Sequence, residues 1–339
     1  MIRAFGPGRV NLIGEHTDYN GGLALPFAID RGVTVHAERL DGGEIRAEAR
    51  DLGETDAFPV HASERATGWR AFVRGTVAEL RAAGIDVPGA RLALEGDVPR
   101  GSGLSSSAAL EAALCLALLA LAGAGEPDRT ELARLCSRVE NEWVGAETGL
   151  LDQLAALRCE AGHALRIDFA TLALAQVPLE LGGWRLATLE SGARHDHAEG
   201  GYNERRAECR AACEALGVEH LSAAEPAAAE RLPEPLRRRA RHVLSENARV
   251  DAMVRALRAG DLPSAGALLD ASHASLRDDY EASVPEVETA VERFRAAGAA
   301  GARMVGGGFG GSVLALFTPE APVPAGAHLV APGPPARRL

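Results

Sequence analysis

The chain has 339 residues, of which 47% are hydrophobic, and this length and composition suit about two domains with substantial cores. Its formal net charge of −11 argues against nucleic acid or an anionic membrane as the main partner. All 36 basic residues are arginine, which excludes a Walker A loop and a protein-kinase site, because both designs need a lysine.

The first half of the chain predicts strands and helices in alternation. Short apolar runs within residues 23–50 are typical of strands. The spacing of Trp69, Phe72 and Val73 predicts a helix over 69–83. Further elements are expected in chain order: a strand over 90–94, a turn over 100–103, a helix over 105–121 and, after a capping-box pattern at Asp128 and Glu131, a helix to about Trp143.

The second half predicts a change of architecture. Short strands are expected within 160–191, helices from about 202 to 300, and a final strand over 313–317. Six prolines follow Phe317 and predict an extended or irregular tail. We expect two domains, residues 1–178 and residues 179–339.

The cysteines and the N-terminal segment give no sign of secretion. Five cysteines, an odd number, occur without a Cys-x-x-Cys pair, which argues against a disulfide framework or a zinc site. Arg3 interrupts any apolar run of the kind that a signal peptide needs. The stretch nearest to a membrane span, Ala108–Ala124, contains Glu111 and predicts a buried core helix. We therefore expect a cytoplasmic protein.

Small residues fill Gly103–Ala109, between a predicted strand and a predicted helix. Glycine and serine let the backbone approach a ligand closely, and the unpaired N–H groups of a first helical turn suit an anion such as a triphosphate. The serine hydroxyls add donors, and one could ligate Mg²⁺. The alternative is that a serine simply caps a buried helix.

A second glycine-rich segment, Gly306–Gly311, is glycine at every position except Phe309. It contains the dinucleotide pattern G-x-G-x-x-G, but a strand is expected after it in place of a helix, and the acidic Glu320 follows too closely. The segment therefore predicts a glycine loop that closes over another element, with a ligand-free turn as the alternative.

The segment Gly8–Gly22 is dense in groups that form hydrogen bonds, namely Arg9, Glu15, His16, Asp18 and Asn20. Sugar hydroxyls both donate and accept, so carboxylates and imidazole bind them well. The apolar residues between these side chains argue against a purely solvated loop, which is the alternative.

Asp152 follows two leucines in Gly149–Gln153, so its carboxylate is expected to be partly buried. A buried carboxylate usually has a charged partner or a function, and Arg9 is the candidate partner. The alternative is an aspartate at the N-terminus of a helix.

Together these segments resemble the GHMP family of small-molecule kinases and, within it, the galactokinases. Gly8–Gly22 is similar to the galactokinase signature, Pro99–Ala109 to the phosphate loop of the family, and Arg303–Gly311 to its third glycine-rich motif. The resemblance implies the α+β two-domain GHMP kinase fold, with the active site in the cleft between the domains. It also implies ATP and Mg²⁺, and transfer of the γ-phosphoryl group to the anomeric hydroxyl of D-galactose.

The resemblance implies a role for each matching position. The sugar would be held by Glu15, His16, Asp18, Gly149, Asp152 and Tyr202. The phosphates of ATP would be held by Gly101, Ser102, Gly103, Leu104, Ser105, Ser106 and Ser107, and Mg²⁺ by Ser107 (or Ser106) and Glu140. Similarity around Arg194–His195 extends the match.

Arg9 and Asp152 would form the catalytic pair, and two roles of Asp152 stay open. It could accept the proton of the sugar hydroxyl as a general base, or only orient that hydroxyl while Arg9 stabilises charge on the phosphoryl group. Two other functions also stay open: a related 1-kinase acting on arabinose, galacturonate or N-acetylgalactosamine, and a non-catalytic sugar sensor. We expect a monomer that binds a sugar and ATP, and neither nucleic acid nor membrane.

Overall fold

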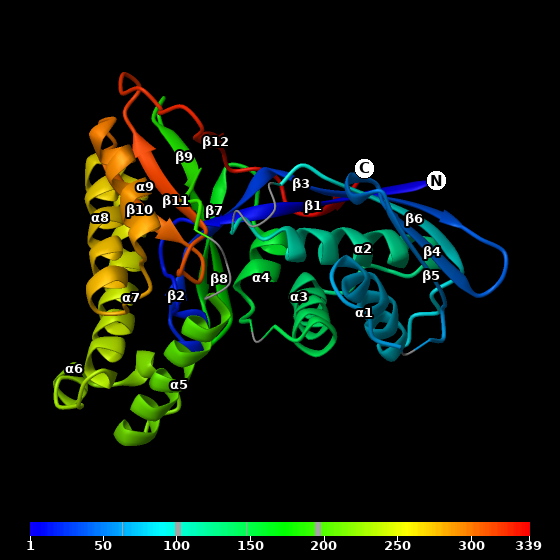
Figure 1. Ribbon diagram of the computed structural model, residues 1–339, viewed down its shortest axis with the longest axis horizontal. Coiled ribbons are helices and arrows are strands. Elements are labelled where there is room, and N and C mark those ends of the chain that lie inside the picture. Colours follow the sequence, from blue (N-terminus) through cyan, green and yellow to red (C-terminus); the bar gives the residue numbers. More distant parts are fainter. Residues whose placement is uncertain (63, 99–102, 147, 194–197) are drawn as a thin grey trace.

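The computed structural model of the chain describes residues 1–62, 64–98, 103–146, 148–193 and 198–339. Figure 1 shows two lobes side by side, with both termini on the same lobe. This arrangement confirms the predicted α+β fold with two lobes. Among the described residues, none of the helices is both long and apolar enough to cross a membrane.

A six-stranded sheet is the framework of the first lobe. Its spatial order is β13 (Arg337–Arg338), β1 (Ile2–Asn11), β3 (Pro26–Arg39), β6 (Ala90–Gly96), β4 (Glu44–Ala49) and β5 (Glu54–Pro59). Neighbours are antiparallel except β4 and β6, which are parallel. The helices α1 (Trp69–Ala82), α2 (Ser106–Ala122), α3 (Arg129–Arg138) and α4 (Leu151–Arg158) lie on one side of this sheet (Figure 1).

Helix α2 is the apolar centre of the first lobe, and β1 and β3 pack against it. Twelve of its residues are buried, including Glu111, as the predicted core helix required. Gly6 of β1 permits this packing, because a Cβ there would lie 2.0 Å from the carbonyl oxygen of Ala109. The N-terminal part of α2 therefore packs closely against β1 at a fixed distance.

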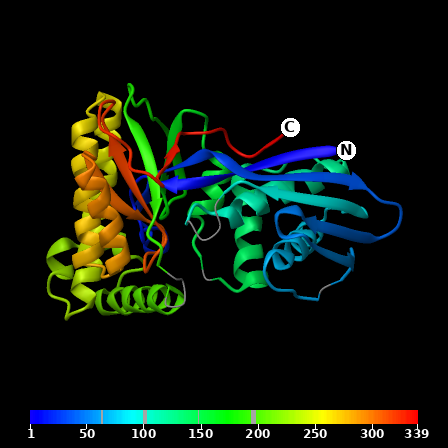
Figure 2. The same cartoon turned by 45° about the horizontal axis from the view of Figure 1, so that its top comes forward.

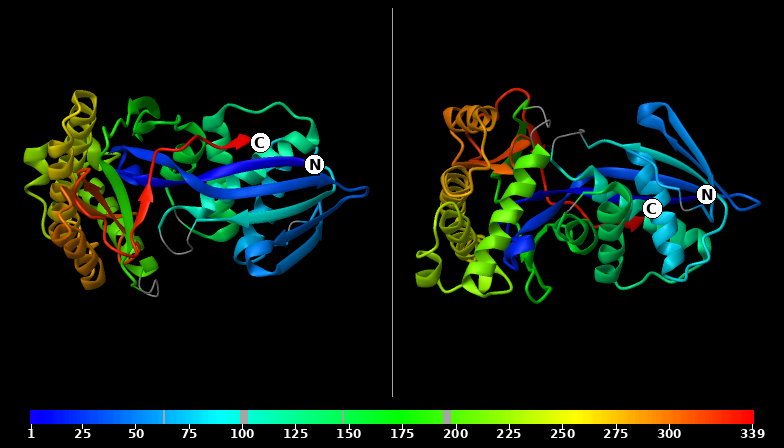
Figure 3. Two further views of the ribbon diagram at one scale, coloured as in Figure 1. Left: turned by 90° about the horizontal axis from the view of Figure 1, so that it is seen from above. Right: turned by 60° about the horizontal axis from the view of Figure 1, so that its bottom comes forward.

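The second lobe pairs an antiparallel sheet with long helices. The sheet has the order β10 (Gly301–Val305), β11 (Ser312–Phe317), β9 (Arg185–Glu190) and β12 (His328–Val330). It packs against α8 (Leu262–Asp278) and α9 (Pro285–Ala296), and further helices are α5 (Ala198–Leu216), α6 (Pro226–Ala229) and α7 (Leu236–Ala259). In Figures 2 and 3, the helices α7, α8 and α9 lie at the end of this lobe that is far from the first lobe.

A small three-stranded sheet lies between the lobes (Figure 1). It consists of β2 (Leu23–Ala24), β7 (His163–Asp168) and β8 (Ala173–Pro178), and it contacts α4 of the first lobe and α7 of the second. The strand after β8 belongs to a different sheet, which supports the domain boundary at residue 178 that we propose.

Two sequence predictions need correction. The strand over 313–317 is not the last, because β12 and β13 follow it, and β13 pairs with β1 through Ala4 and Arg338. The edge of the six-stranded sheet offers unpaired backbone groups, and the tail satisfies them. The helix after Asp128 is capped as predicted, but α3 ends at Arg138 and continues as a π-helix, Val139–Val144.

Candidate active site

A cavity of about 530 Å³ lies where the loop after β1 meets the two glycine-rich loops and the start of α4. Its walls contain every described residue that was predicted to bind the sugar: Glu15, His16, Asp18, Gly149, Asp152 and Tyr202. Arg9, Gly103 and the glycines of the segment 306–311 complete the walls. The predicted sugar residues, which come from distant parts of the chain, therefore meet at one place.

Arg9 and Asp152 form a two-point ion pair at the base of this cavity. Arg9 Nε donates to Asp152 Oδ1 and Arg9 Nη2 donates to Oδ2, both at 2.7 Å. Arg9 Nη1 also donates to the carbonyl oxygen of Gly103. The predicted partnership of Arg9 and Asp152 is confirmed, and it ties β1 to the phosphate loop and to α4.

The phosphate loop leaves the first turn of α2 open. Ser105, at the N-cap position, has φ of +58° and makes no capping hydrogen bond. Its hydroxyl instead donates to Asp152 Oδ2 at 2.7 Å. The alternative that a serine merely caps this helix is therefore wrong at Ser105, and the N-terminal end of the helix dipole faces the loop.

Glu15 is almost fully buried, and several donors hold its carboxylate. Arg303, which has no exposed surface, places Nη2 at 2.6 Å from Oε2, and Asn11 donates to the same oxygen at 2.5 Å. The backbone N–H of Gly306 donates to Oε1 at 2.9 Å. Burial raises the pKa of Glu15, and the charge of Arg303 reduces that rise. Glu15 thus fixes the glycine-rich loop to the loop after β1 as well as lining the cavity.

His16 is buried in the cavity wall with a backbone φ of +60°, in the left-handed region that side chains rarely adopt. Its Nδ1 lies 2.8 Å from the hydroxyl of Tyr19. Its Nε2 is buried and has no partner in the described part of the chain. Burial, with the charges of His242 and Arg205, lowers the pKa of His16 to about 3, so the ring is neutral. Because Nε2 has no exposed surface, His16 lines the cavity with other atoms of the residue.

Asp18 and Gly149 are in close contact across the cavity. A Cβ on residue 149 would lie 1.9 Å from Asp18 Oδ2, so only glycine fits there. Burial and the charge of Asp152 raise the pKa of Asp18 to about 6, against an opposing hydrogen bond from the backbone of Tyr19. Glu15 and Asp18 thus both have a raised pKa in this cavity, and such perturbed carboxyls are typical of a functional site.

The segment Gly306–Gly311 is the turn of a hairpin between β10 and β11. Gly306, Gly308, Gly310 and Gly311 have positive φ, and Phe309 has φ of +57°. The turn approaches Gly103, since a Cβ there would lie 3.8 Å from the carbonyl oxygen of Val305. The segment joins two strands and opens no helix, which argues against the dinucleotide pattern, and its approach to Gly103 supports a loop that closes over another element.

Glu140 lies in the π-helix and is 7% exposed. Its Oε2 accepts from Gln153 Nε2 at 2.6 Å and from Thr148 Oγ1 at 3.1 Å. Burial, and then the charge of Asp152, raises its pKa, while a hydrogen bond from Ser107 opposes the rise. The two predicted metal ligands, Ser107 and Glu140, therefore lie together at the start of α2.

A second cavity, of about 720 Å³, lies on the other side of the phosphate loop. Its walls include Leu52, Trp69, Phe72, Leu94, Val98, Ser106, Ser107 and Leu110. Gly103 lines the first cavity and Ser106 the second, so the start of α2 borders both. The sequence analysis did not predict this second cavity, because its apolar residues and its charged residues, Asp51, Glu54, Arg70 and Glu95, come from separate segments and form no motif along the chain.

Some predicted positions lie outside the described residues, namely Gly101, Ser102, Arg194 and His195. Leu104 lies in the phosphate loop, buried, and its carbonyl oxygen accepts from the backbone N–H of Arg9 at 3.0 Å. Sequence reasoning missed the roles of Arg303, Tyr19 and Gln153 in holding the cavity side chains. An isolated buried arginine or glutamine gives no pattern along the chain that could have revealed its partner.

Three family descriptions match the chain in order. The galactokinase galactose-binding signature matches residues 2–39, the GHMP kinases N terminal domain matches residues 71–160, and the GHMP kinases C terminal domain matches residues 253–329.

Individual relatives match over most of their length. A galactokinase of Streptomyces coelicolor is 45% identical over 322 residues, covering 91% of this chain and 83% of the relative. A galactokinase of Roseiflexus is 43% identical, covering 93% of this chain and 83% of the relative. The crystal structure of Lactococcus lactis galactokinase complexed with galactose has a TM-score of 0.92 and 33% identity, covering 100% of this chain and 95% of that one. A mevalonate kinase of Methanococcus jannaschii, at 19% identity and a TM-score of 0.72, shares the fold.

Proposed function

The chain belongs to the galactokinases of the GHMP kinase family, and we propose that it transfers the γ-phosphoryl group of ATP to the anomeric hydroxyl of D-galactose. The observation that carries the proposal is the Arg9–Asp152 ion pair in the wall of a cavity formed by the galactose-binding signature. The product would be galactose 1-phosphate.

The sugar would occupy the cavity of about 530 Å³. Asp18 supplies carboxylate acceptors, His16 supplies part of the buried wall, and Tyr202 supplies a hydroxyl and an aromatic ring. Gly149 leaves room for the carboxylate of Asp18 itself, since a Cβ there would lie 1.9 Å from Asp18 Oδ2. Hexoses have several hydroxyls that donate and accept, and this mixed set of side chains matches them.

The geometry of Arg9 supports a double role in the transfer. Arginine has five N–H donors, and three of those of Arg9 are used on Asp152 and Gly103. The remaining two can reach the phosphoryl group and stabilise charge in a loose transition state. The ion pair would thus place a fixed cation between the sugar hydroxyl and the phosphates.

Asp152 would hold the anomeric hydroxyl. A carboxylate offers about four lone-pair sites, and Arg9 and Ser105 occupy three of those on Asp152. The free site can accept the hydrogen bond of the hydroxyl and direct its oxygen at the phosphorus. As the new oxygen–phosphorus bond forms, the bond to the leaving ADP oxygen breaks, and the hydroxyl proton passes to Asp152 or to solvent.

ATP would span the two cavities. Its base would enter the cavity of about 720 Å³ beside Trp69 and Phe72, whose rings offer apolar surface. Its phosphates would follow the phosphate loop, including Gly101 and Ser102, to the first turn of α2. The open N-terminus of that helix supports an anion there.

Mg²⁺ would be held by Ser107 and Glu140. The buried carboxylate of Glu140 lies near a second carboxylate, Asp152, which disfavours its charge, and a divalent cation would relieve that cost. The described residues contain no group of three or more metal-ligating side chains, which fits Mg²⁺ that takes one or two protein ligands and otherwise phosphates and water. When bound, the ion would neutralise negative charge on the phosphates.

The predicted monomer stays a proposal, in which one chain supplies all the groups named for the reaction. The use of ATP supports the predicted cytoplasmic location. Size-exclusion chromatography with light scattering would check the first point, since a catalytically active monomer is expected.

A sugar-panel assay tests the proposed function. The purified protein is given Mg-ATP with galactose, arabinose, galacturonate or N-acetylgalactosamine, and ADP release is measured. We expect the highest kcat/KM with galactose. A higher value for another sugar would make the protein a related 1-kinase, and no sugar-dependent ADP release would make it a sensor; either result would refute the proposal.

A further inference from the structure

A chain of hydrogen bonds runs behind His16, away from the cavity. His16 Nδ1 lies 2.8 Å from the hydroxyl oxygen of Tyr19, which lies 2.8 Å from the hydroxyl oxygen of Tyr280. The Tyr280 hydroxyl lies 3.1 Å from Cys209 Sγ. We call His16, Tyr19, Tyr280 and Cys209 the histidine relay.

The relay is built as a rigid unit. Tyr280 has no exposed surface, and its ring centroid lies 4.5 Å from that of His16. Tyr202 lies at 5.6 Å from His16. Aromatic neighbours at these distances limit rotation of the imidazole ring. The backbone of His16 is fixed as well, because the side chain of Asn20 donates to its carbonyl oxygen at 2.7 Å.

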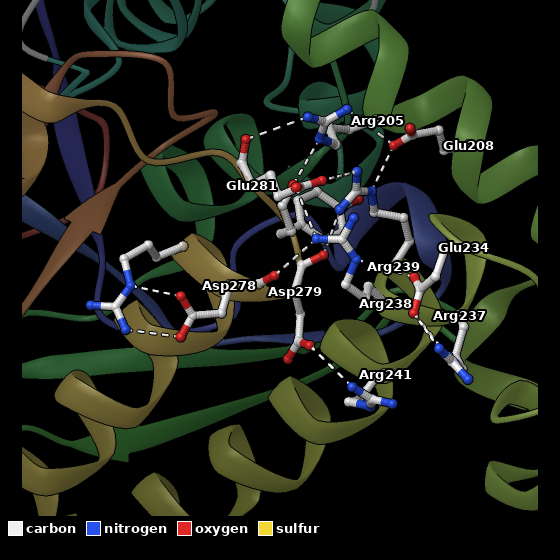
Figure 4. A network of polar contacts seen from close by, with 12 residues as sticks. Arg205, Glu208, Glu234, Arg237, Arg238, Arg239, Arg241, Asp278, Asp279 and Glu281 are labelled. Atoms are coloured by element: carbon white, nitrogen blue, oxygen red, sulfur yellow. Dashed lines mark hydrogen bonds and ion pairs between the residues drawn. The ribbon is translucent and has the colours of Figure 1, made fainter.

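An arginine network fixes the far end of the relay (Figure 4). Arg205 Nε donates to the carbonyl oxygen of Tyr280 at 2.7 Å. Arg239, 1% exposed, donates to Glu208 at 2.6 Å and to Glu281 at 2.7 Å, on the turn that carries Tyr280. Figure 4 shows these side chains converging on that turn from neighbouring helices. Tyr280 therefore has a fixed position from which to hold Tyr19.

Hydrogen counting gives the relay a direction. Each tyrosine hydroxyl can donate one hydrogen, and Cys209 Sγ already lies 3.6 Å from the donating amide of Asn20. If Cys209 donates to Tyr280, Tyr280 to Tyr19 and Tyr19 to His16, every hydrogen in the relay has an acceptor. In the opposite direction Cys209 would accept twice, and its own hydrogen would have no acceptor among the described residues.

We propose that Tyr19 and Tyr280 are positioning residues that hold the ring of His16 in the cavity wall, with Nδ1 as an acceptor and the hydrogen on the buried Nε2. The neutral imidazole has one N–H, so an accepting Nδ1 leaves the hydrogen on Nε2. The relay would then fix the orientation of the imidazole ring in the wall of the sugar cavity, beside the acceptors of Asp18. This inference rests on the proposed galactose site.

The tautomer of His16 can be measured directly in the sugar-free protein by NMR spectroscopy. With ¹⁵N-labelled histidine, nitrogen chemical shifts report which ring nitrogen carries hydrogen, and His16→Gln identifies the His16 signals. We expect hydrogen on Nε2 in the unaltered chain and a mixture of tautomers in Tyr19→Phe. A wild-type signal with hydrogen on Nδ1 would overturn the proposal, whatever the sugar assay gives.

Kinetics give the second readout. Tyr19→Phe and Tyr280→Phe should each raise the KM for galactose about fivefold, the value of roughly one neutral hydrogen bond, with kcat and the KM for ATP within about twofold. Cys209→Ser keeps a donor and should behave as the unaltered chain, whereas Cys209→Ala should weaken the relay. Cys213→Ala, on the same helix α5, is the matched control.

Folding is checked by thermal unfolding of each variant. If Tyr280→Phe proves unstable because its hydroxyl is fully buried, Tyr19→Phe carries the test, since Tyr19 is only partly buried. Equal tautomer signals and equal KM in Tyr19→Phe and in the unaltered chain would show that the relay does not position His16.

Discussion

Arg9 and Asp152 lie 143 residues apart in the sequence and share two hydrogen bonds of 2.7 Å. One residue is on strand β1 and the other in the first turn of α4, and Ser105 from the phosphate loop joins them through Asp152 Oδ2. The pair therefore links the sugar-binding segment to the phosphate-binding segment. A change at either residue should affect turnover more than the binding of one substrate.

Asp152→Asn should remove most turnover. The amide has no negative charge for Arg9 and accepts no proton, so we expect kcat to fall about 100-fold or more. ATP binding, measured by isothermal titration calorimetry, should change less than about twofold, because the nucleotide cavity and the start of α2 stay intact. Asp86→Asn, at an exposed position, is the control. Near-normal turnover in Asp152→Asn would remove both catalytic roles from this residue.

Gly149→Ala should damage sugar binding selectively. The added Cβ would lie 1.9 Å from Asp18 Oδ2, so the carboxylate must leave its position. We expect the KM for galactose to rise about tenfold or more, with little change in the KM for ATP, since displacing a charged acceptor costs more than about 1 kcal/mol. Gly125→Ala, where a Cβ meets no atom within 4 Å, is the matched control. Equal KM values for galactose in the two variants would contradict the contact.

Local features of the chain were predictable from sequence. The helix α1 follows the apolar spacing of its residues, and the side chain of Asp128 accepts from the backbone of Thr130 and Glu131 as its capping pattern predicted. The Arg9–Asp152 contact was also predictable, because a carboxylate after two leucines needs a partner and few motifs offer a cation. These features depend on neighbours in sequence or on charge balance.

Long-range packing decided what the sequence could not reveal. The π-helix containing Glu140 packs against α1, where a Cβ on Gly75 would lie 2.7 Å from Trp143. The ion pair of Arg303 with Glu15 and the bond of Tyr280 with Tyr19 connect the two lobes. No periodicity or spacing marks such contacts, since each partner is a single residue in an ordinary helix, strand or loop.

Asp18→Asn should stabilise the fold while impairing the sugar site. Burial, with the charge of Asp152, raises the pKa of Asp18 from 3.8 to about 6. The folded state then binds a proton more tightly than the unfolded state, so stability is full below pH 3.8, falls as pH rises to about 6, and stays lower above it. Removing this ionisation should increase the free energy of unfolding at pH 7.5 by up to about 3 kcal/mol.

Asp18→Asn should also lose the decrease in kcat/KM for galactose that is expected at low pH. For the unaltered chain, kcat/KM for galactose should fall below about pH 6 as Asp18 binds a proton, whereas Asp18→Asn should have a low, flatter profile there. Urea unfolding at pH 4 and pH 7.5 measures the stability difference. If the variant is less stable than the unaltered chain at pH 7.5, the ionised carboxylate of Asp18 stabilises the folded state, and the prediction is wrong.

Glu246→Gln tests whether the carboxylate of Glu246 stabilises the loop that follows β1 and contains Gly14. Glu246 of α7 is fully buried and accepts from the backbone N–H of Gly14 at 3.0 Å, from Ser272 at 2.6 Å and from Arg249 at 2.6 Å. Burial alone would raise its pKa, but Arg249, with His242, Arg303 and Ser272, lowers it to about 2. The carboxylate therefore stabilises the folded state.

The sign of the pH dependence follows from that lowered pKa. A carboxyl that ionises more easily when folded adds stability above its unfolded pKa of 4.5, and this is lost as pH falls toward about 2. Glu246→Gln should thus lower the free energy of unfolding by about 3 kcal/mol at pH 7, and by clearly less at pH 3. Urea unfolding at the two pH values measures this, with exposed Glu292→Gln as control. A loss of equal size at both pH values would mean that packing, and not the charge of Glu246, holds the loop at Gly14.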